Sequence, residues 1–329
     1  MAKIKAGIVG YGNLGKGVQL ALEQNPALEL VAIFTRRSPE SLKIGDSNIK
    51  VENTKVAVSY QDKIDIMFLC GGSATDLPVQ GPQFARLFNT VDSFDTHARI
   101  PEYYQKMDEI ARENNNTSAI SIGWDPGLFS LNRLLGEAIL PGGKGYTFWG
   151  PGVSQGHSDA IRKIKGVKDA VQYTIPRKEV LNKVREGENP QLTSAEKHLR
   201  KCYVVVEEGM AKDKISRKIK NMPDYFADYR TEVNFVTESE LKKKHYQIPH
   251  GGFVLHTTRT GNREENKQMV EFSLKLDSNP QFTASVLIAY GRAVYCLNQE
   301  KKYGAKTIFD IPPAYLSNRS GAELRKELL

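Results

Sequence analysis

Residues 5–17 read KAGIVGYGNLGKG, and this stretch decides the fold of the first half of the chain. The apolar run Ala6–Val9 is typical of a buried β-strand, and it leads into a G-x-G-x-x-G motif and a helical pattern. Gly10 permits a tight turn, Gly12 leaves room for a pyrophosphate at the backbone, and Gly15 lets the helix pack on the strand. Because a helix N-terminus also attracts phosphate, the motif predicts a bound dinucleotide. The residues expected to contact it are Gly10, Tyr11, Gly12, Asn13 and Leu14.

The composition is that of a globular protein with room for two domains. The 329 residues include 40% hydrophobic and 26% charged residues, no apolar run is as long as a membrane span, and no signal pattern precedes the first strand. Three scattered cysteines without metal-ligand spacing predict no disulfide, no metal and a cytoplasmic location. The net charge of +8 is modest, and basic runs such as Lys242–Lys244 and Arg162–Lys165 predict solvated faces. We therefore expect neither a nucleic-acid nor a membrane partner.

A second apolar strand, expected over residues 28–34, ends in Thr35-Arg36-Arg37. In this kind of domain the tip of that strand faces the adenosine ribose. A carboxylate there binds the 2′-hydroxyl of NAD, whereas arginine accommodates the 2′-phosphate of NADP. No carboxylate stands at this tip, and two guanidinium groups, which bind phosphate bidentately, do. The sequence therefore favours NADP, with Thr35, Arg36 and Arg37 in contact with it.

The next buried strand, expected over residues 64–70, runs into a glycine-rich turn. Such a turn at the carboxyl end of a parallel strand lies in the ligand crevice, and we expect it near the nicotinamide half of the cofactor. The residues expected there are Cys70, Gly71, Gly72, Ser73, Ala74 and Thr75. Cys70 itself is better interpreted as packed core than as a nucleophile, because no activating base stands near it in the sequence.

Strands and helices continue to alternate up to about residue 125. The expected helices span residues 82–88 and 101–114, and the expected strands span residues 89–97 and 118–122. This alternation predicts a doubly wound parallel sheet, an α/β fold of the Rossmann type. Acidic and aromatic side chains follow its strand ends, and that edge of the sheet is the candidate site. These side chains are Asp95, Trp124 and Asp125.

Past about residue 125 the strands are separated by shorter helical segments. They are expected over residues 173–175, 202–206, 231–236, 253–258 and 269–276, and a long helix with a core-facing apolar stripe is expected over residues 280–297. This pattern predicts a second domain of the α+β class with a mostly antiparallel sheet. The last ten residues are expected to form a helix that returns to the first domain.

Longer segments are more specific than the cofactor motif. They include GWDPGLFSLNR (residues 123–133), TFWGPGVSQGHSDA (147–160) and LKLDSNPQFTAS (274–285). With VDSFDTH, VQYTIP, MPDYF and PHGG, they resemble the NADP-dependent meso-diaminopimelate dehydrogenases over nearly the whole chain. The resemblance implies an oxidoreductase of lysine and cell-wall precursor biosynthesis. Such a homodimer reversibly deaminates the D-centre of meso-2,6-diaminopimelate to L-2-amino-6-oxopimelate, ammonia and NADPH.

The resemblance also implies a division of labour along the chain. A dinucleotide-binding domain is expected over residues 1–125, completed by residues 295–329, and a substrate-binding and dimerisation domain over residues 126–294. Asp95, Asp125 and Trp124 are the expected catalytic residues, because carboxylates can hold the reacting ammonium and move its proton while an indole excludes water. Arg200 is expected to pair with the distal carboxylate. The remaining substrate-binding residues are expected to be Trp149, Gln155, Gly156, Thr174, His250 and Asn279, with Asp159 on the same closing loop.

Several alternatives remain open at this point. Asp92 could take the role of Asp95, His157 could cap a helix, and only one of Arg200 and Lys201 need point inward. His198 is expected to be exposed, and His97 and His256 to be structural. A sugar oxidoreductase or a dihydrodipicolinate reductase would share the two-domain plan, but the Glu-Lys-Pro motif of the former and the paired histidines of the latter are absent. An NADP-sensing protein without chemistry would be expected to have lost the pocket residues.

Overall fold

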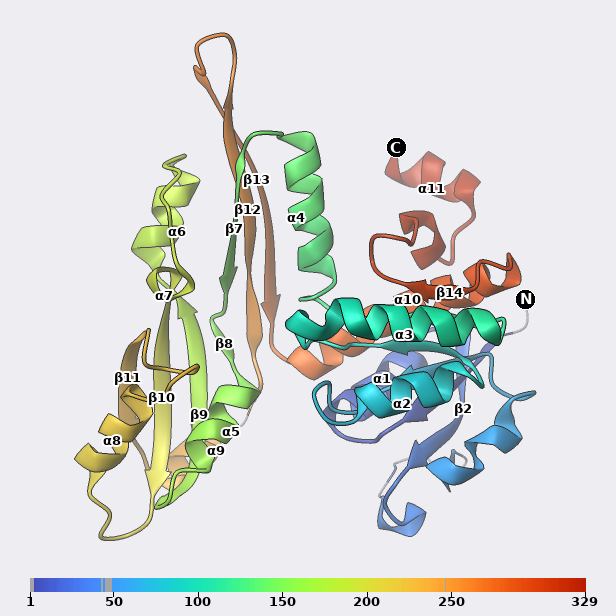
Figure 1. Cartoon of the computed structure of the whole chain (residues 1–329), viewed down its shortest axis with the longest axis horizontal. Coiled ribbons are helices and arrows are strands. Elements are labelled where there is room, and N and C mark those ends of the chain that lie inside the picture. Colours follow the sequence, from blue (N-terminus) through green and yellow to red (C-terminus); the bar gives the residue numbers. More distant parts are fainter. Residues whose placement is uncertain (1–2, 43, 45–48, 246) are drawn as a thin grey trace. The chain divides into compact units, whose positions relative to one another are not determined.

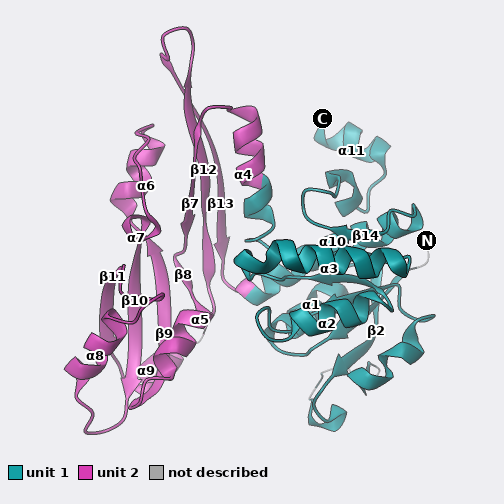
Figure 2. Cartoon of the chain, viewed as in Figure 1, with its two compact units in different colours: residues 1–131, 280–329 teal, residues 132–279 magenta. Residues whose placement is uncertain are grey.

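A seven-stranded parallel sheet organises the first of two units into which the chain divides, residues 1–131 with 280–329 (Figures 1 and 2). The structure is a computed structural model, and it describes residues 3–42, 44, 49–245 and 247–329. The strand order is β14-β6-β5-β4-β1-β2-β3. The strands are β1 (Ile4–Val9), β2 (Leu28–Thr35), β3 (Lys50–Asn53), β4 (Ile66–Leu69), β5 (Asn89–Asp92), β6 (Thr117–Ala119) and β14 (Gly304–Lys306).

Helices cover both faces of this sheet, as its buried central strands, such as β4 and β6, require. The helices of this unit are α1 (Asn13–Glu23), α2 (Leu77–Ala85), α3 (Ile100–Glu113), α11 (Gly321–Leu328) and, from its second residue, α10 (Asn279–Gln299). Apolar residues of α1 and α10 pack with one face of β1, and those of α2 and α3 form a second cluster on the other face. The predicted doubly wound sheet and the core role of the long helix are therefore confirmed.

The second unit, residues 132–279, contains two sheets (Figure 2). One has the order β11-β10-β9-β8 and the other β13-β12-β7. The strands are β7 (Lys144–Trp149), β8 (Gly152–Val153), β9 (Val167–Pro176), β10 (His198–Val206), β11 (Arg230–Phe235), β12 (His250–Thr260) and β13 (Asn266–Leu276). All their pairings are antiparallel except that of β10 with β11, so the mostly antiparallel prediction is confirmed.

Short helices accompany these sheets. They are α5 (Gln155–Arg162), α6 (Lys178–Arg185), α7 (Ser194–Lys197), α8 (Lys212–Lys220) and α9 (Glu238–His245), whereas α4 (Leu128–Ile139) begins in the first unit and ends in the second. In the described ranges, no helix combines the length and the apolar character needed to cross a membrane. Lys242, Lys243 and Lys244 are exposed on α9, as predicted.

Candidate active site

The glycine-rich turn between β1 and α1 has the geometry that its sequence predicts. Gly10 has a φ of +90°, and a Cβ on Gly15 would lie 2.1 Å from the Gly10 carbonyl oxygen. Both positions therefore exclude larger residues. Gly12 caps the helix, and a Cβ there would meet no protein atom within 4 Å. No protein atom occupies the space beside Gly12, so a phosphate group can approach the backbone at this residue.

The arginines after β2 are both exposed and held in place. An Nη of Arg36 lies 2.8 Å from Oδ1 of Asp76, and an Nη of Arg37 lies 3.4 Å from the Tyr11 carbonyl oxygen. Oδ2 of Asp76 accepts a 3.0 Å hydrogen bond from Gly72 N–H. Asp76 therefore links Arg36, at the tip of β2, to the turn after β4. The sequence alone did not identify Asp76 as a site residue. Its signal in the sequence was only its position one residue past that turn.

The turn after β4 is connected to the loop after β5 through Ser73. Its Oγ accepts hydrogen bonds from the backbone N–H of Asp95 (2.8 Å) and of Thr96 (3.2 Å). Cys70 packs against the apolar cluster of α1 and α10, and burial raises the pKa of its thiol. A protonated, packed thiol is a poor nucleophile, which agrees with the core interpretation of Cys70.

The two carboxylates near the end of β5 have different surroundings. Asp92 is fully buried and accepts hydrogen bonds from Phe94 N–H (2.9 Å), Ser121 N–H (3.2 Å) and the Tyr103 hydroxyl (2.7 Å). Burial raises the pKa of Asp92 to about 6 despite these donors. Asp95 is exposed at the sheet edge. Asp92 thus ties β5 to the segment after β6, and Asp95 is the carboxylate that a ligand can reach.

Trp124 and Asp125 follow β6 at the same edge of the sheet. Trp124 is 8% exposed, bridges to Gly127, and packs edge-on against Phe129 with ring centroids 5.2 Å apart. Asp125 is half-buried. The parallel topology therefore brings the glycine-rich turn, the two arginines, Asp95 and this turn to one edge of the first unit.

In the second unit, strand register brings the predicted substrate-binding residues together. His250 packs against Gly152, where a Cβ would lie 2.5 Å from the imidazole Cγ. Gly152 is the register partner of Thr174, and Thr174 is the register partner of Arg200. The Asn279 N–H donates to the Ile248 carbonyl oxygen, close in sequence to His250. These residues were predicted from separate segments of the chain. In the structure, Thr174 and Arg200 are neighbours in one sheet, and His250, at the start of a strand of the other sheet, packs beside them.

Arg200 is a buried cation, and its Nη1 donates to Oγ1 of Thr174. Its side chain is 8% exposed, its Cζ lies 4.0 Å from the ring centroid of Tyr229, and burial lowers the pKa of the guanidinium. No Asp or Glu in the described ranges lies within 4.0 Å of it. A buried cation without a carboxylate is costly, and a carboxylate on a ligand would supply the missing charge. Lys201 lies on the other face of β10, over Tyr203.

His198 is not exposed, so that expectation was wrong. It is 1% exposed, its Nε2 accepts the Trp149 N–H at 2.8 Å, and its Nδ1 lies 2.9 Å from the Ser194 carbonyl oxygen. The imidazole stacks on the Trp149 indole with centroids 5.4 Å apart. Burial lowers the pKa of His198 to about 4, so the ring is neutral and positions Trp149. The alternation of β10, which buries every second residue from His198 to Cys202, was the missed signal.

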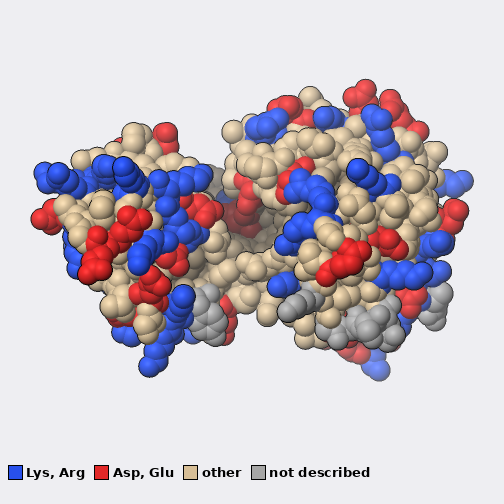
Figure 3. Space-filling view, turned by 90° about the horizontal axis from the view of Figure 1, so that it is seen from below, with Lys and Arg blue, Asp and Glu red and all other residues tan. Residues whose placement is uncertain are grey.

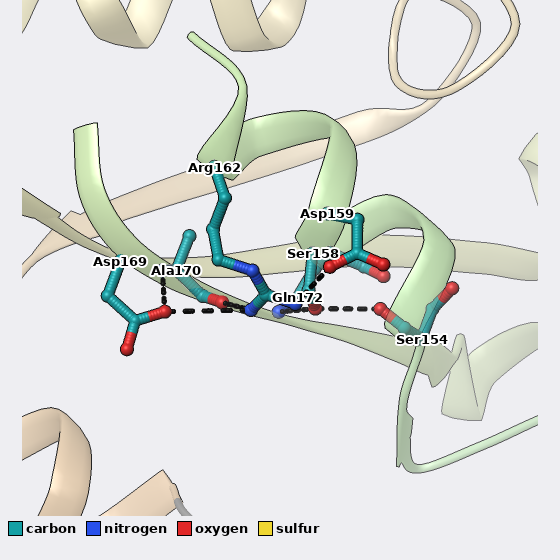
Figure 4. Close-up of polar contacts among 7 residues, drawn as sticks. All are labelled: Ser154, Ser158, Asp159, Arg162, Asp169, Ala170 and Gln172. Atoms are coloured by element: carbon teal, nitrogen blue, oxygen red, sulfur yellow. Dashed lines mark hydrogen bonds and ion pairs between the residues drawn. The ribbon is translucent and has the colours of Figure 1, made fainter. Parts of the chain in front are cut away.

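Helix α5 presents Gln155 and Gly156 in its first turn, and its far end is anchored by Arg162 (Figure 4). The guanidinium donates to the Ala170 carbonyl oxygen and to Asp159 Oδ1, each at 2.5 Å. The expected solvated face was therefore wrong at Arg162, which fastens α5 to β9. Asp159 is engaged by this arginine. His157 contacts Ser154 Oγ at 2.7 Å, and burial and the Arg200 charge lower its pKa to about 4.

Charges of both signs are interspersed on the face of each unit shown in Figure 3. No broad single-signed surface of the kind that binds nucleic acid is visible on that face. Within the ranges that the structure describes, no group of three His, Cys, Asp or Glu side chains is placed to hold a metal ion.

A doubly wound sheet with a glycine-rich phosphate turn, joined to a separate unit with a buried arginine, defines a dinucleotide-dependent oxidoreductase. Residues 123–278 match the family model for the diaminopimelic acid dehydrogenase C-terminal domain. The meso-diaminopimelate D-dehydrogenase of Acetivibrio thermocellus is 61% identical, with 100% of this chain and 98% of the relative covered. The chain therefore belongs to the meso-diaminopimelate D-dehydrogenase family.

Two solved structures are similar over 100% of both chains. The Corynebacterium glutamicum diaminopimelate dehydrogenase in complex with diaminopimelate is 42% identical, with a TM-score of 0.91. An engineered D-amino acid dehydrogenase bound to NADP+ is 41% identical, with a TM-score of 0.86. Family membership confirms the resemblance drawn from the sequence and removes the sugar-oxidoreductase and dihydrodipicolinate-reductase alternatives.

Proposed function

We propose that this chain catalyses the NADP-linked, reversible oxidative deamination of meso-2,6-diaminopimelate at its D-configured carbon. The products are L-2-amino-6-oxopimelate, ammonia and NADPH. The observation that carries the proposal is Arg200, a buried cation bonded to Thr174 with no carboxylate partner among the described residues. The distal carboxylate of the substrate is negatively charged and planar, so it can pair with this guanidinium through two parallel hydrogen bonds.

The first unit is proposed to bind the cofactor. The open backbone at Gly12 receives the pyrophosphate, and Arg36 and Arg37 receive the 2′-phosphate. The turn from Cys70 to Thr75 lies beside the nicotinamide half. When bound, NADP accepts a hydride from the substrate carbon, and the protein supplies the orientation and the electrostatics.

The reacting amine is proposed to lie against Asp95 and Asp125. Both carboxylates follow neighbouring strands of the parallel sheet, and Ser73 fixes the backbone at Asp95. One carboxylate holds the ammonium group and accepts a proton from it, and the other, which remains charged, stabilises the iminium that forms as the carbon loses its hydride. Trp124 and Trp149 exclude water from the imine until hydrolysis.

The second unit is proposed to read the non-reacting end of the substrate. Because meso-diaminopimelate carries one D and one L centre, the enzyme must recognise the L end to select the D carbon for reaction. Arg200 and Thr174 bind the distal carboxylate. The remaining substrate-binding residues are proposed to be Trp149, Gln155, Gly156, His250 and Asn279, of which His250 packs against Gly152, the register partner of Thr174.

We further propose that the chain works as a homodimer in the cytoplasm, with dimerisation through the second unit. The location is supported by the sequence, whose three cysteines are widely separated and lack disulfide or metal-ligand spacing. Sedimentation equilibrium tests the assembly, and a mass equal to one chain at micromolar concentration would contradict it.

The deciding experiment measures initial rates of NADPH formation with meso-, LL- and DD-diaminopimelate, each with NADP and with NAD. We expect turnover of the meso isomer with NADP and little with the LL isomer, which has no D centre. Binding of NADP without turnover of any isomer would leave the cofactor assignment standing and remove the substrate assignment.

A further inference from the structure

Two side chains in the second unit contain completely buried polar atoms that have no hydrogen-bond partner in the described part of the chain. They are Gln172, through both Oε1 and Nε2, and Arg200, through Nε. Gln172 is 0% exposed. An unsatisfied buried amide or guanidinium nitrogen loses its hydrogen bonds to water without replacement, so such atoms in a folded protein need an explanation.

Strand register places these atoms near each other. On β9 and β10, Gln172 is the partner of Cys202 and Thr174 is the partner of Arg200. Gln172 and Arg200 are therefore diagonal neighbours, a relation in which long side chains reach each other across a strand pair. Both lie on the face that contains Ala170, Cys202 and Val204, since alternate residues of each strand are buried.

The opposite face of the same strands has its own contacts. Tyr173 donates or accepts a 2.9 Å hydrogen bond with His245, and Tyr203 stacks on that imidazole with centroids 4.0 Å apart. Gln172 and Thr174 of β9 therefore lie on the same face as Arg200, whereas Tyr173 lies on the opposite face and contacts α9 through His245.

The chemistry of the two unsatisfied groups is complementary. The Arg200 Nε is only a donor, and the Gln172 Oε1 is an acceptor. We propose that Gln172 is a positioning residue for Arg200, with its Oε1 bound to the Arg200 Nε–H through an ordered water. This inference rests on the proposed function, because the orientation it fixes is that of the guanidinium toward the distal carboxylate.

The burial of its individual nitrogen atoms determines which side of the Arg200 guanidinium a ligand can reach. Arg200 Nε is inaccessible to solvent, so a ligand that enters from solvent meets the Nη nitrogens, one of which already contacts Thr174. Tyr229 holds one face of the guanidinium plane. The ring of Tyr229 leaves the guanidinium free to turn within its own plane, and the hydrogen bond from Nε to Gln172 through water prevents that turn. Gln172 acts behind Arg200 and does not touch the substrate.

Gln172→Leu tests the proposal, with Tyr173→Phe as the matched control on the opposite face of the same strand. For Gln172→Leu we expect kcat/KM on meso-diaminopimelate to fall about tenfold, the worth of one hydrogen bond to a charged group, mainly through KM. Rates on a D-amino acid without a distal carboxylate should change less than about twofold. Thermal stability should be largely retained, because leucine needs no hydrogen-bond partner at this buried position, which offsets the loss of the water-mediated contact to Arg200. Gln172→Glu should also raise KM, because its carboxylate pairs with Arg200 and competes with the substrate.

Three outcomes overturn the proposal. They are an unchanged substrate preference in Gln172→Leu, an equal loss on both substrates, and the same loss in Tyr173→Phe. A crystal structure of the wild-type protein at high resolution provides a readout without activity. Electron density for a water between Gln172 Oε1 and Arg200 Nε is expected, and its absence overturns the proposal even if the chain does not turn over meso-diaminopimelate. That last result would separately refute the proposed function.

Discussion

Replacing Arg200 with methionine tests the assignment of the substrate unit most directly. Methionine preserves much of the side-chain length and removes the charge that a distal carboxylate would pair with. Truncating one partner of a buried, hydrogen-bonded charge pair costs about 2–5 kcal/mol. At about 1.4 kcal/mol per factor of ten, kcat/KM for meso-diaminopimelate should fall roughly 30-fold to several thousandfold.

The effect on folding should be much smaller. Arg200 is 8% exposed and lacks a carboxylate partner in the described ranges, so methionine removes a desolvated charge as well as the contacts with Thr174 and Tyr229. These contributions oppose each other, and the free energy of unfolding should change by less than about 2 kcal/mol. A large loss of activity in a stable protein is therefore the expected combination.

The assay compares NADPH formation from meso-diaminopimelate with that from a D-amino acid that has no distal carboxylate. The second substrate should lose less than about tenfold, because its binding does not use the charge pair. Lys201→Met is the control, since this cation lies on the opposite face of β10 over Tyr203. Equal losses on both substrates in Arg200→Met, or the same selective loss in Lys201→Met, would refute the reasoning.

Three further predictions concern the cofactor and the acid stability of the fold. Gly12→Ala should fold normally, because its Cβ meets no protein atom within 4 Å, yet weaken NADP binding by about tenfold in a fluorescence titration. Arg36→Gln and Arg37→Gln should each lower the preference for NADP over NAD by roughly tenfold or more, and unchanged preference in both would contradict the assignment. The pKa of His198 is about 4 in the folded protein against an ordinary 6.5, so its contribution is full above pH 6.5 and is lost as the pH falls toward 4. His198→Gln should therefore reduce the acid-dependent loss of unfolding free energy over that range by on the order of 3 kcal/mol, measured by urea unfolding against the exposed His97→Gln control.

The parts of the fold that the sequence predicted depend on local rules. The spacing of Gly10, Gly12 and Gly15 specifies a strand, a tight turn and a packed helix within one short segment. The parallel sheet follows from repeated strand–helix alternation, which then requires strand ends to meet at one edge. The strands expected for the second domain omit β7 and β8. Only Gly150 and Pro151 separate these two strands, and β8 begins at Gly152 and has two residues, so this segment lacks a continuous strand pattern.

What the sequence could not predict depends on partners far away along the chain. His198 is buried because Trp149 N–H and the Ser194 carbonyl oxygen satisfy both of its nitrogens. Asp92 rather than Asp95 is buried because Tyr103 and Ser121 reach it. In neither case does the identity of the residue decide its exposure, since a histidine or an aspartate is buried only where donors and acceptors meet it.

The substrate end of the site is harder to find in the sequence than the cofactor end for the same physical reason. A phosphate-binding turn consists of backbone N–H groups on consecutive residues, so its glycine spacing is visible in the sequence. The distal-carboxylate site consists of groups on neighbouring strands whose incomplete hydrogen bonding is itself the signal, and that signal exists only after β9 and β10 pair. Arg200 reduces the stability of the unit that contains it, because its charge is buried without a carboxylate partner among the described residues. A carboxylate ligand would offset the cost at Arg200, so the least stable arrangement in this sheet is the one that best defines its ligand.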